Sequence, residues 1–205
     1  MNVMRGMRTL LVPALLAAVL VTVAAAPPPA PLKVGEKAPD FTLNDLLGGG
    51  EVTLSEVVQE HRLTVVVWVG VECPYSNACN EDLIVLQDRY GEREVALLAV
   101  NSNESETVEE VREHARSSGF TFPVMYDPGN VVADRFDAVF TPEVWILDRT
   151  MTARFHGGLI SRGNDKSIQN DLRAALEALL DGREPPQTET RAFGCTIVRV
   201  IKETA

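Results

Sequence analysis

The sequence predicts an α/β fold with a central mixed β-sheet, helices on both faces and an extended C-terminal tail. Two segments, Leu63–Val69 and Val95–Val100, are almost entirely apolar and rich in β-branched residues, as in strands that are buried on both faces. Stretches with helical patterning alternate with these and with other short strands. After Pro185 and Pro186 no helical pattern remains, because consecutive prolines end a helix.

The remaining elements follow in chain order. Short strands are expected at Phe41–Leu43, within the stretch 122–127 (FPVMYD), at Val144–Leu147 and, as an edge strand, at Arg154–His156. Helices are expected at Ser55–His61 with Ser55 as the cap, at Pro74–Tyr90, at Thr107–Ser118 before the stop at Gly119, at Asn130–Phe136 and at Ser167–Leu180.

The N-terminus has the layout of a secretory signal peptide. Arg5 and Arg8 precede an apolar run at Leu10–Val23, and small residues follow at 24–26. The run is short for a membrane span, which needs about 20 apolar residues, and an uncleaved anchor is the alternative. We therefore expect a signal peptide at 1–26 and export to a periplasmic or extracellular location.

The other expected divisions are a proline-rich linker at 27–33, a single domain at 34–182 and a tail at 183–205 that carries Cys195. The formal net charge is −10 at pH 7, and loss of the two signal-peptide arginines would make it −12. An acidic chain of this kind does not attract nucleic acid or anionic membrane through its overall charge. Membrane contact is expected only through an uncleaved N-terminal segment.

All three cysteines lie beyond the expected signal peptide, so disulfides could persist where the protein is exported. Because the number is odd, at least one thiol is free, pairs transiently or pairs between chains.

Cys73 follows a predicted buried strand and precedes Pro74, a residue favoured at the first position of a helix. The positive end of the helix dipole and its free N–H groups would stabilise a thiolate there. The neighbouring carboxylate of Glu72 acts in the opposite direction. The sequence favours a reactive thiol over an inert cysteine in a strand-to-helix turn.

Cys79 recurs with Leu83, Leu86 and Tyr90 at helical spacing, which describes one apolar face. In a continuous helix its Cα would lie about 9 Å from that of Cys73 along the axis, whereas a disulfide needs Cα atoms within about 7 Å. A core position is therefore favoured for Cys79, and a role as resolving thiol is the alternative.

Cys195 follows Gly194, which suits a close backbone approach. It is either a strand residue packed under the tail or a partner that the tail brings to Cys73. Thr141 and Pro142 form a Thr-Pro step before a predicted strand, where a cis peptide bond can be locked. Beside Cys73, a cis-proline would expose backbone groups able to pair with an extended substrate.

Together these segments resemble the thioredoxin superfamily, and within it the peroxiredoxin-like redoxins of the alkyl hydroperoxide reductase/thiol-specific antioxidant type. The resemblance covers about 34–180 and is carried by VGEKAPDFTL, VVVWVGVECP, LLAVNSN, FPVMYDPGNVVADRF and TPEVWILD. The opening is also similar to that of membrane-tethered disulfide reductases. The resemblance implies a thioredoxin-like fold, with Cys73 as nucleophile and Pro142 as the cis-proline. Gly194–Ile197 is similar to a Gly-Cys-x-Ile element near the end of such chains.

The sequence departs from the family patterns at three positions. Ser76 stands where a Cys-x-x-Cys pair has its second cysteine, and Gly70 and Val66 stand where peroxiredoxins have a threonine and a proline. The threonine helps to orient peroxide, so the resemblance leaves open whether the substrate is a peroxide or a disulfide.

The expected function is that of a thiol-based oxidoreductase in which Cys73 attacks a peroxide or a protein disulfide and an unidentified thiol reductant recycles the protein. No cofactor is required. One alternative is a copper-binding chaperone that uses Cys73, Cys79 and His156, since soft thiolates select Cu(I). Another is a non-catalytic module with a permanent Cys73–Cys195 disulfide.

Overall fold

The structure, a computed structural model, describes residues 30–159, 161–162, 168–169 and 171–201. The expected signal peptide at 1–26 and residues 27–29 of the linker lie outside these residues. In the described part of the chain, no helix has both the length and the apolar character needed to cross a membrane.

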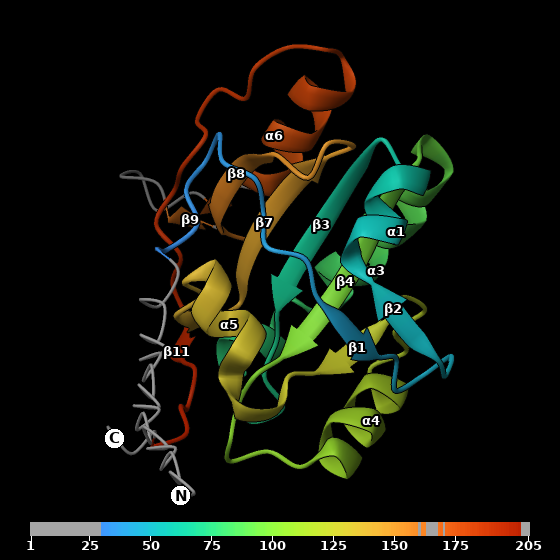
Figure 1. The fold of residues 1–205 in the computed structure, drawn as a ribbon, viewed down its shortest axis with the longest axis vertical. Coiled ribbons are helices and arrows are strands. Elements are labelled where there is room, and N and C mark those ends of the chain that lie inside the picture. Colours follow the sequence, from blue (N-terminus) through green and yellow to red (C-terminus); the bar gives the residue numbers. More distant parts are fainter. Residues whose placement is uncertain (1–29, 160, 163–167, 170, 202–205) are drawn as a thin grey trace, which may run out of the picture.

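A five-stranded sheet forms the centre, in the order β5-β4-β3-β7-β8 (Figure 1). Its strands are β3 (Leu63–Trp68), β4 (Val95–Asn101), β5 (Val124–Tyr126), β7 (Glu143–Asp148) and β8 (Ala153–Gly158). Strands β4 and β5 run parallel to β3, whereas β7 pairs antiparallel with both β3 and β8. The sheet is therefore mixed, as predicted, and β8 occupies one edge.

Helices cover both faces of the sheet because the central strands are apolar on both sides. One face packs against α3 (Asn80–Tyr90), α4 (Val108–Ser117) and α6 (Asp171–Leu180). The other packs against α1 (Leu54–Glu60) and α5 (Val131–Phe136). Alternate residues of β3 divide between the two cores, with Val65 and Val67 on the first side and Val66 and Trp68 on the second.

Three small two-stranded sheets surround this centre. Strands β1 (Thr42–Asn44) and β2 (Glu51–Thr53) form a hairpin, and β9 (Ser161–Arg162) pairs with β10 (Ile168–Gln169). The third consists of β6 (Phe140–Thr141) and β11 (Cys195–Thr196), so the C-terminal tail returns to the end of the sheet where Cys73 lies. Two 3₁₀ turns, Gly91–Arg93 and Pro128–Asn130, complete the elements.

The structure corrects the single helix expected at Pro74–Tyr90. The chain forms a one-turn helix, α2 (Pro74–Asn77), and then α3, with Ala78 and Cys79 between them. The Cys79 N–H donates to the carbonyl of Ser76 at 2.9 Å, three residues back, and Cys79 has φ −103° and ψ 0°. This tighter turn interrupts the α-helical ladder.

Two predicted helix starts also differ. Helix α1 follows Thr53 as its N-cap, and Ser55 lies inside the helix, where its N–H and hydroxyl both donate to the carboxylate of Asp40 at 2.9 and 2.7 Å. The predicted cap is therefore wrong, because an upstream carboxylate satisfies the first turn. Helix α6 begins at Asp171, and the predicted start at Ser167 lies outside the described residues.

Candidate active site

Cys73 lies just beyond the C-terminal end of β3 and caps α2. The residue is buried, with 4% of its surface exposed. Its Sγ accepts a hydrogen bond from the N–H of Ser76 at 3.3 Å and, as a thiol, donates to the carbonyl of Thr141 at 3.0 Å. The expected helix N-terminus is present, but α2 has only four residues and supplies one N–H rather than a long helix dipole.

The Thr141–Pro142 peptide bond is cis, in the position that the sequence indicated. It joins β6 to β7, so Thr141 presents its backbone beside Cys73 at the end of the sheet. Thr141 is 1% exposed.

Cys195 pairs with Thr141 across the antiparallel β6–β11 ladder. The two strands approach closely at Gly194, the residue before Cys195, because a Cβ there would stand only 1.9 Å from the Thr141 carbonyl oxygen. The ring of Phe193 meets that of Tyr75 from α2 edge-on, with centroids 4.8 Å apart. The tail therefore brings Cys195 to Cys73, which was one of the two alternatives open for it.

The pKa values of these two thiols shift in opposite directions. Burial opposes ionisation of Cys73, but hydrogen bonds from the Cys195 thiol, the Thr141 hydroxyl and the Ser76 N–H together lower its pKa. Burial, the hydrogen bond to Cys73 and the Cys73 charge raise the pKa of Cys195 to about 11. Of the two thiols, Cys73 therefore ionises at the lower pH.

Cys79 lies in the core on the α3 side of the sheet, with Leu83, Leu86 and Tyr90. It is 5% exposed, and burial, Asp82 and Cys73 raise its pKa to about 11. The predicted core position is confirmed even though the helix breaks at this residue. Hydrogen bonding at Cys73 involves Cys195 and does not involve Cys79.

Glu106 is a site residue that sequence reasoning missed. Its carboxylate is 4% exposed and accepts the N–H groups of Val71 and Glu72, each at 3.0 Å, as well as the amide of Asn101. It thus fixes the two residues that precede Cys73. In the sequence Glu106 is one of several acidic residues between 104 and 113, and its contact joins two βα loops that are distant in the chain.

Gly70 is closely surrounded where the peroxiredoxin pattern has a threonine. A Cβ there would stand 3.0 Å from the Asn103 side-chain nitrogen, 3.2 Å from the Cys73 Cβ and 3.2 Å from the Thr141 hydroxyl. These distances are tighter than ordinary van der Waals contact, so a larger side chain would require these neighbours to shift by a few tenths of an ångström. Val66, at the position of the family's proline, is fully buried in the core.

His156 is separate from this thiol site. Its Nε2 lies 2.6 Å from the buried carboxylate of Glu143, and its ring stacks on Trp145 with centroids 3.9 Å apart. Within the described ranges, no group of three or more histidine, cysteine or acidic side chains could hold a metal ion. The copper site considered from the sequence, with Cys73, Cys79 and His156, is therefore not assembled.

Comparison with known proteins identifies the family. The family model described as "AhpC/TSA family" matches residues 34–156, which is more than half of the chain. The chain belongs to the AhpC/TSA family. This membership confirms the redoxin resemblance.

Two solved structures resemble this AhpC/TSA protein over most of its length. One is an uncharacterized conserved protein from Geobacillus kaustophilus, and the other is a hypothetical protein from Sinorhizobium meliloti 1021. Each has a TM-score of 0.76 and 30% identity and covers 84% of this chain, with 94% and 98% of their own chains matched.

A curated relative is the thiol-disulfide oxidoreductase ResA from Geobacillus thermodenitrificans, 30% identical over 130 residues. The match covers 57% of this chain and 64% of ResA, so just under two thirds of the relative is represented. In the AhpC/TSA chain described here, Ser76 lies three residues after Cys73, and its hydroxyl accepts the N–H of Gly70 at 3.1 Å.

Proposed function

We propose that this protein is a dithiol–disulfide oxidoreductase whose reactive pair is Cys73 and Cys195. One observation carries the proposal: β11 pairs with β6 so that Cys195 lies opposite Thr141, the residue whose carbonyl accepts the Cys73 thiol. The second cysteine thus comes from the C-terminal tail rather than from the helix after the nucleophile, where Ser76 stands.

The exchange has two steps. The Cys73 thiolate attacks one sulfur of a substrate disulfide, forms a mixed disulfide and releases the other substrate sulfur as a thiolate. Cys195 loses its proton and attacks Cys73 Sγ, which forms the Cys73–Cys195 disulfide and releases the second substrate thiolate. Two electrons pass from the dithiol to the substrate disulfide, and an external thiol reductant restores the dithiol. The reverse sequence oxidises a substrate dithiol.

The surroundings of Cys73 favour disulfide exchange over peroxide reduction. Peroxide would give a sulfenic acid and release water or an alcohol, and condensation with Cys195 would release a further water. Such a reaction profits from a donor at the position of Gly70, where a Cβ would already crowd Asn103 and Thr141. An extended disulfide-bearing segment instead needs a backbone partner beside Cys73, and the pairing of β11 with Thr141 is an example of an extended segment bound there.

The same proposal extends to location and organisation. The basic start, the apolar run at Leu10–Val23 and the small residues after it support a signal peptide at 1–26, followed by the linker 27–33, the redoxin domain 34–182 and the tail 183–205. A periplasmic or extracellular location would expose the protein to oxidised thiols and disulfides.

The experiment is to reduce the mature protein and treat one sample with a model protein disulfide and another with one equivalent of hydrogen peroxide. Trapped thiols are mapped by non-reducing peptide mass spectrometry over minutes. We expect a Cys73–Cys195 disulfide, formed faster with the disulfide than with peroxide, and none in Cys73→Ser. Faster reaction with peroxide would favour a peroxidase. A pair that resists mild reductant would indicate a structural disulfide, and three thiols unchanged in both samples would overturn the proposal.

A further inference from the structure

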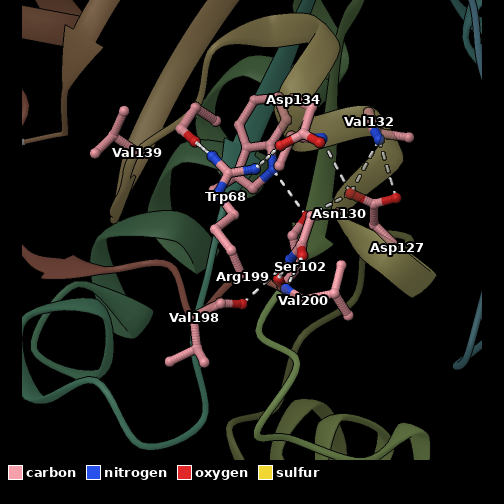
Figure 2. Close-up of polar contacts among 12 residues, drawn as sticks. Trp68, Ser102, Asp127, Asn130, Val132, Asp134, Val139, Val198, Arg199 and Val200 are labelled. Carbon is pink, nitrogen blue, oxygen red and sulfur yellow. Dashed lines mark hydrogen bonds and ion pairs between the residues drawn. The ribbon is translucent and has the colours of Figure 1, made fainter. Parts of the chain in front are cut away.

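The tail beyond Cys195 is held by two buried asparagine side chains. The Asn103 Oδ1 accepts the N–H of Val198 at 3.0 Å, and the Asn130 amide donates to the Val198 carbonyl at 3.2 Å. The Asn130 Oδ1 accepts the N–H of Val200 at 2.7 Å (Figure 2). Asn130 is 1% exposed and Asn103 is 5% exposed. The two amides therefore pair with the tail backbone as a neighbouring strand would.

Contacts within the domain hold Asn130 in place independently of its hydrogen bonds to the tail. It has φ 56° and ψ 30°, a left-handed conformation that asparagine tolerates better than most residues. Its amide also donates to the carbonyl of Ser102. The hydroxyl of Ser102 accepts from the Trp68 indole at 3.1 Å and donates at 2.8 Å to Asp127, which in turn accepts the N–H of Val132 at 3.0 Å (Figure 2).

Other contacts hold the tail in the same position along the domain. The Ile197 N–H donates to the Val139 carbonyl at 2.9 Å, and the Ile197 side chain is 2% exposed. The Glu104 N–H donates to the Val198 carbonyl at 3.0 Å. Arg199 pairs with Asp134 at 2.5 Å and donates to the carbonyl of Ala138.

Register decides whether Cys195 can react. Successive side chains of an extended strand point to opposite faces, so a slip by one residue would turn Cys195 away from Cys73. Only two residue pairs join β6 to β11, which is a short ladder for fixing register by itself. The hydrogen bonds at Val198 and Val200 supply the additional constraint three and five residues further on.

We propose that Asn130 is a positioning residue that sets the effective concentration of the Cys195 thiol at Cys73. The inference rests on the proposed Cys73–Cys195 pair. We call the hydrogen bonds from Asn130 to the backbone of Val198 and Val200 the clamp. With the clamp in place, Cys195 is held beside the mixed disulfide and resolves it quickly. Without the clamp, the tail samples detached positions, so the disulfide becomes easier to reduce and the mixed disulfide persists longer.

The test substitutes Asn130→Gly in the full chain, because glycine suits the left-handed backbone and removes only the amide. Reduction potentials are measured in dithiothreitol buffers, and the mixed-disulfide lifetime is measured by quenching with acid. We expect the Cys73–Cys195 equilibrium constant to fall about tenfold, equivalent to a potential about 30 mV less negative. The rate at which Cys73 attacks the substrate should not fall.

Asn80→Ala is the matched control, since the Asn80 amide joins α3 to Ser118 at 3.1 Å and has no hydrogen bond to the tail. It should leave the potential unchanged. A second variant, Val200→Pro, removes the tail N–H that Asn130 accepts and changes no residue of the domain itself. If the clamp acts through this bond, the shifts of the two variants should not add.

The outcomes separate the two proposals. If the wild type forms no reversible Cys73–Cys195 disulfide, the proposed function fails. If the wild type forms it but Asn130→Gly and Val200→Pro both retain its potential and mixed-disulfide lifetime, the positioning role of Asn130 is wrong. Additive shifts would likewise exclude a clamp acting through the Val200 N–H. Should Asn130→Gly fail to fold, Val200→Pro decides alone.

Discussion

Replacing Gly194 with alanine would place a methyl group inside the backbone of β6. The added Cβ would stand 1.9 Å from the Thr141 carbonyl oxygen, 2.6 Å from its carbon and 3.1 Å from the Pro142 nitrogen, whereas ordinary contact begins at 3.4 Å. Because all three atoms belong to the backbone on either side of the cis peptide bond, no side-chain rotation relieves the overlap. The tail must therefore move away by more than an ångström.

The free-energy cost of the Gly194→Ala substitution follows from the backbone pairing that β11 loses. Separation of β6 and β11 removes the pairing of Cys195 with Thr141 and of Thr196 with Phe140. About two backbone hydrogen bonds at roughly 1 kcal/mol each give about 2 kcal/mol. If that free energy holds Cys195 at Cys73, the disulfide equilibrium constant falls roughly 30-fold and the potential becomes about 40 mV less negative.

The assay equilibrates the variant with dithiothreitol buffers and traps free thiols with a maleimide that shifts gel mobility. Gly91→Ala is the control, since a Cβ at Gly91 meets only the flexible end of Gln87 at 3.1 Å. It should retain the wild-type potential, and circular dichroism should show both variants folded. A Gly194→Ala protein with the wild-type potential would refute the packing of the tail against Thr141 described above.

Three further predictions concern the thiols and the loop before Cys73. The thiolate is the reactive form, so the alkylation rate of Cys73 should rise with pH to half its maximum at a pKa below the usual 9.0. In Cys195→Ala that midpoint should move upward, because a hydrogen-bond donor to the thiolate is lost. Cys79→Ala should leave disulfide formation unchanged, since Cys79 is buried in the core. Glu106→Gln should lower the free energy of unfolding in urea by about 1–3 kcal/mol, because the buried acceptor of two backbone N–H groups is impaired.

Each of these has an outcome that would contradict it. An alkylation midpoint at or above 9.0 in the wild type would mean that burial outweighs the hydrogen bonds at Cys73. A Cys79→Ala protein unable to form the disulfide would make Cys79 the resolving thiol. Glu104→Gln, an exposed neighbour, serves as the control for Glu106→Gln, and equal stability of the two variants would show that the Glu106 carboxylate does not hold the loop.

The features that follow from local pattern were predictable from the sequence. The apolar runs that became β3 and β4 predict strands covered on both faces, and the order of the elements predicts the layers. The break before α3 was missed because Cys79, Leu83 and Leu86 keep an apolar spacing across it. Periodicity reports which side chains face the core, and it does not report the hydrogen bonds at a single turn.

Some residues of the candidate site could be predicted from local sequence, whereas others could not. The Cys73–Pro74 and Thr141–Pro142 steps are each formed by two adjacent residues, and each predicted a local geometry. The contacts of Glu106, Asn103 and Asn130 join segments that are distant in the chain. An asparagine in a loop has the same sequence signature whether it faces solvent or clamps a strand, so only the three-dimensional fold identifies it.

The tail also covers an edge strand of the central sheet. Before it reaches Cys73 it runs along β8, where the His156 N–H donates to the Thr188 carbonyl and the Thr190 N–H donates to the His156 carbonyl, both at 2.9 Å. At the opposite rim, Asp45 bridges to Met125 of β5. Bare strand edges recruit strands from other molecules. Detachment of the whole tail would therefore expose the β8 edge of the central sheet to pairing with a strand of another molecule.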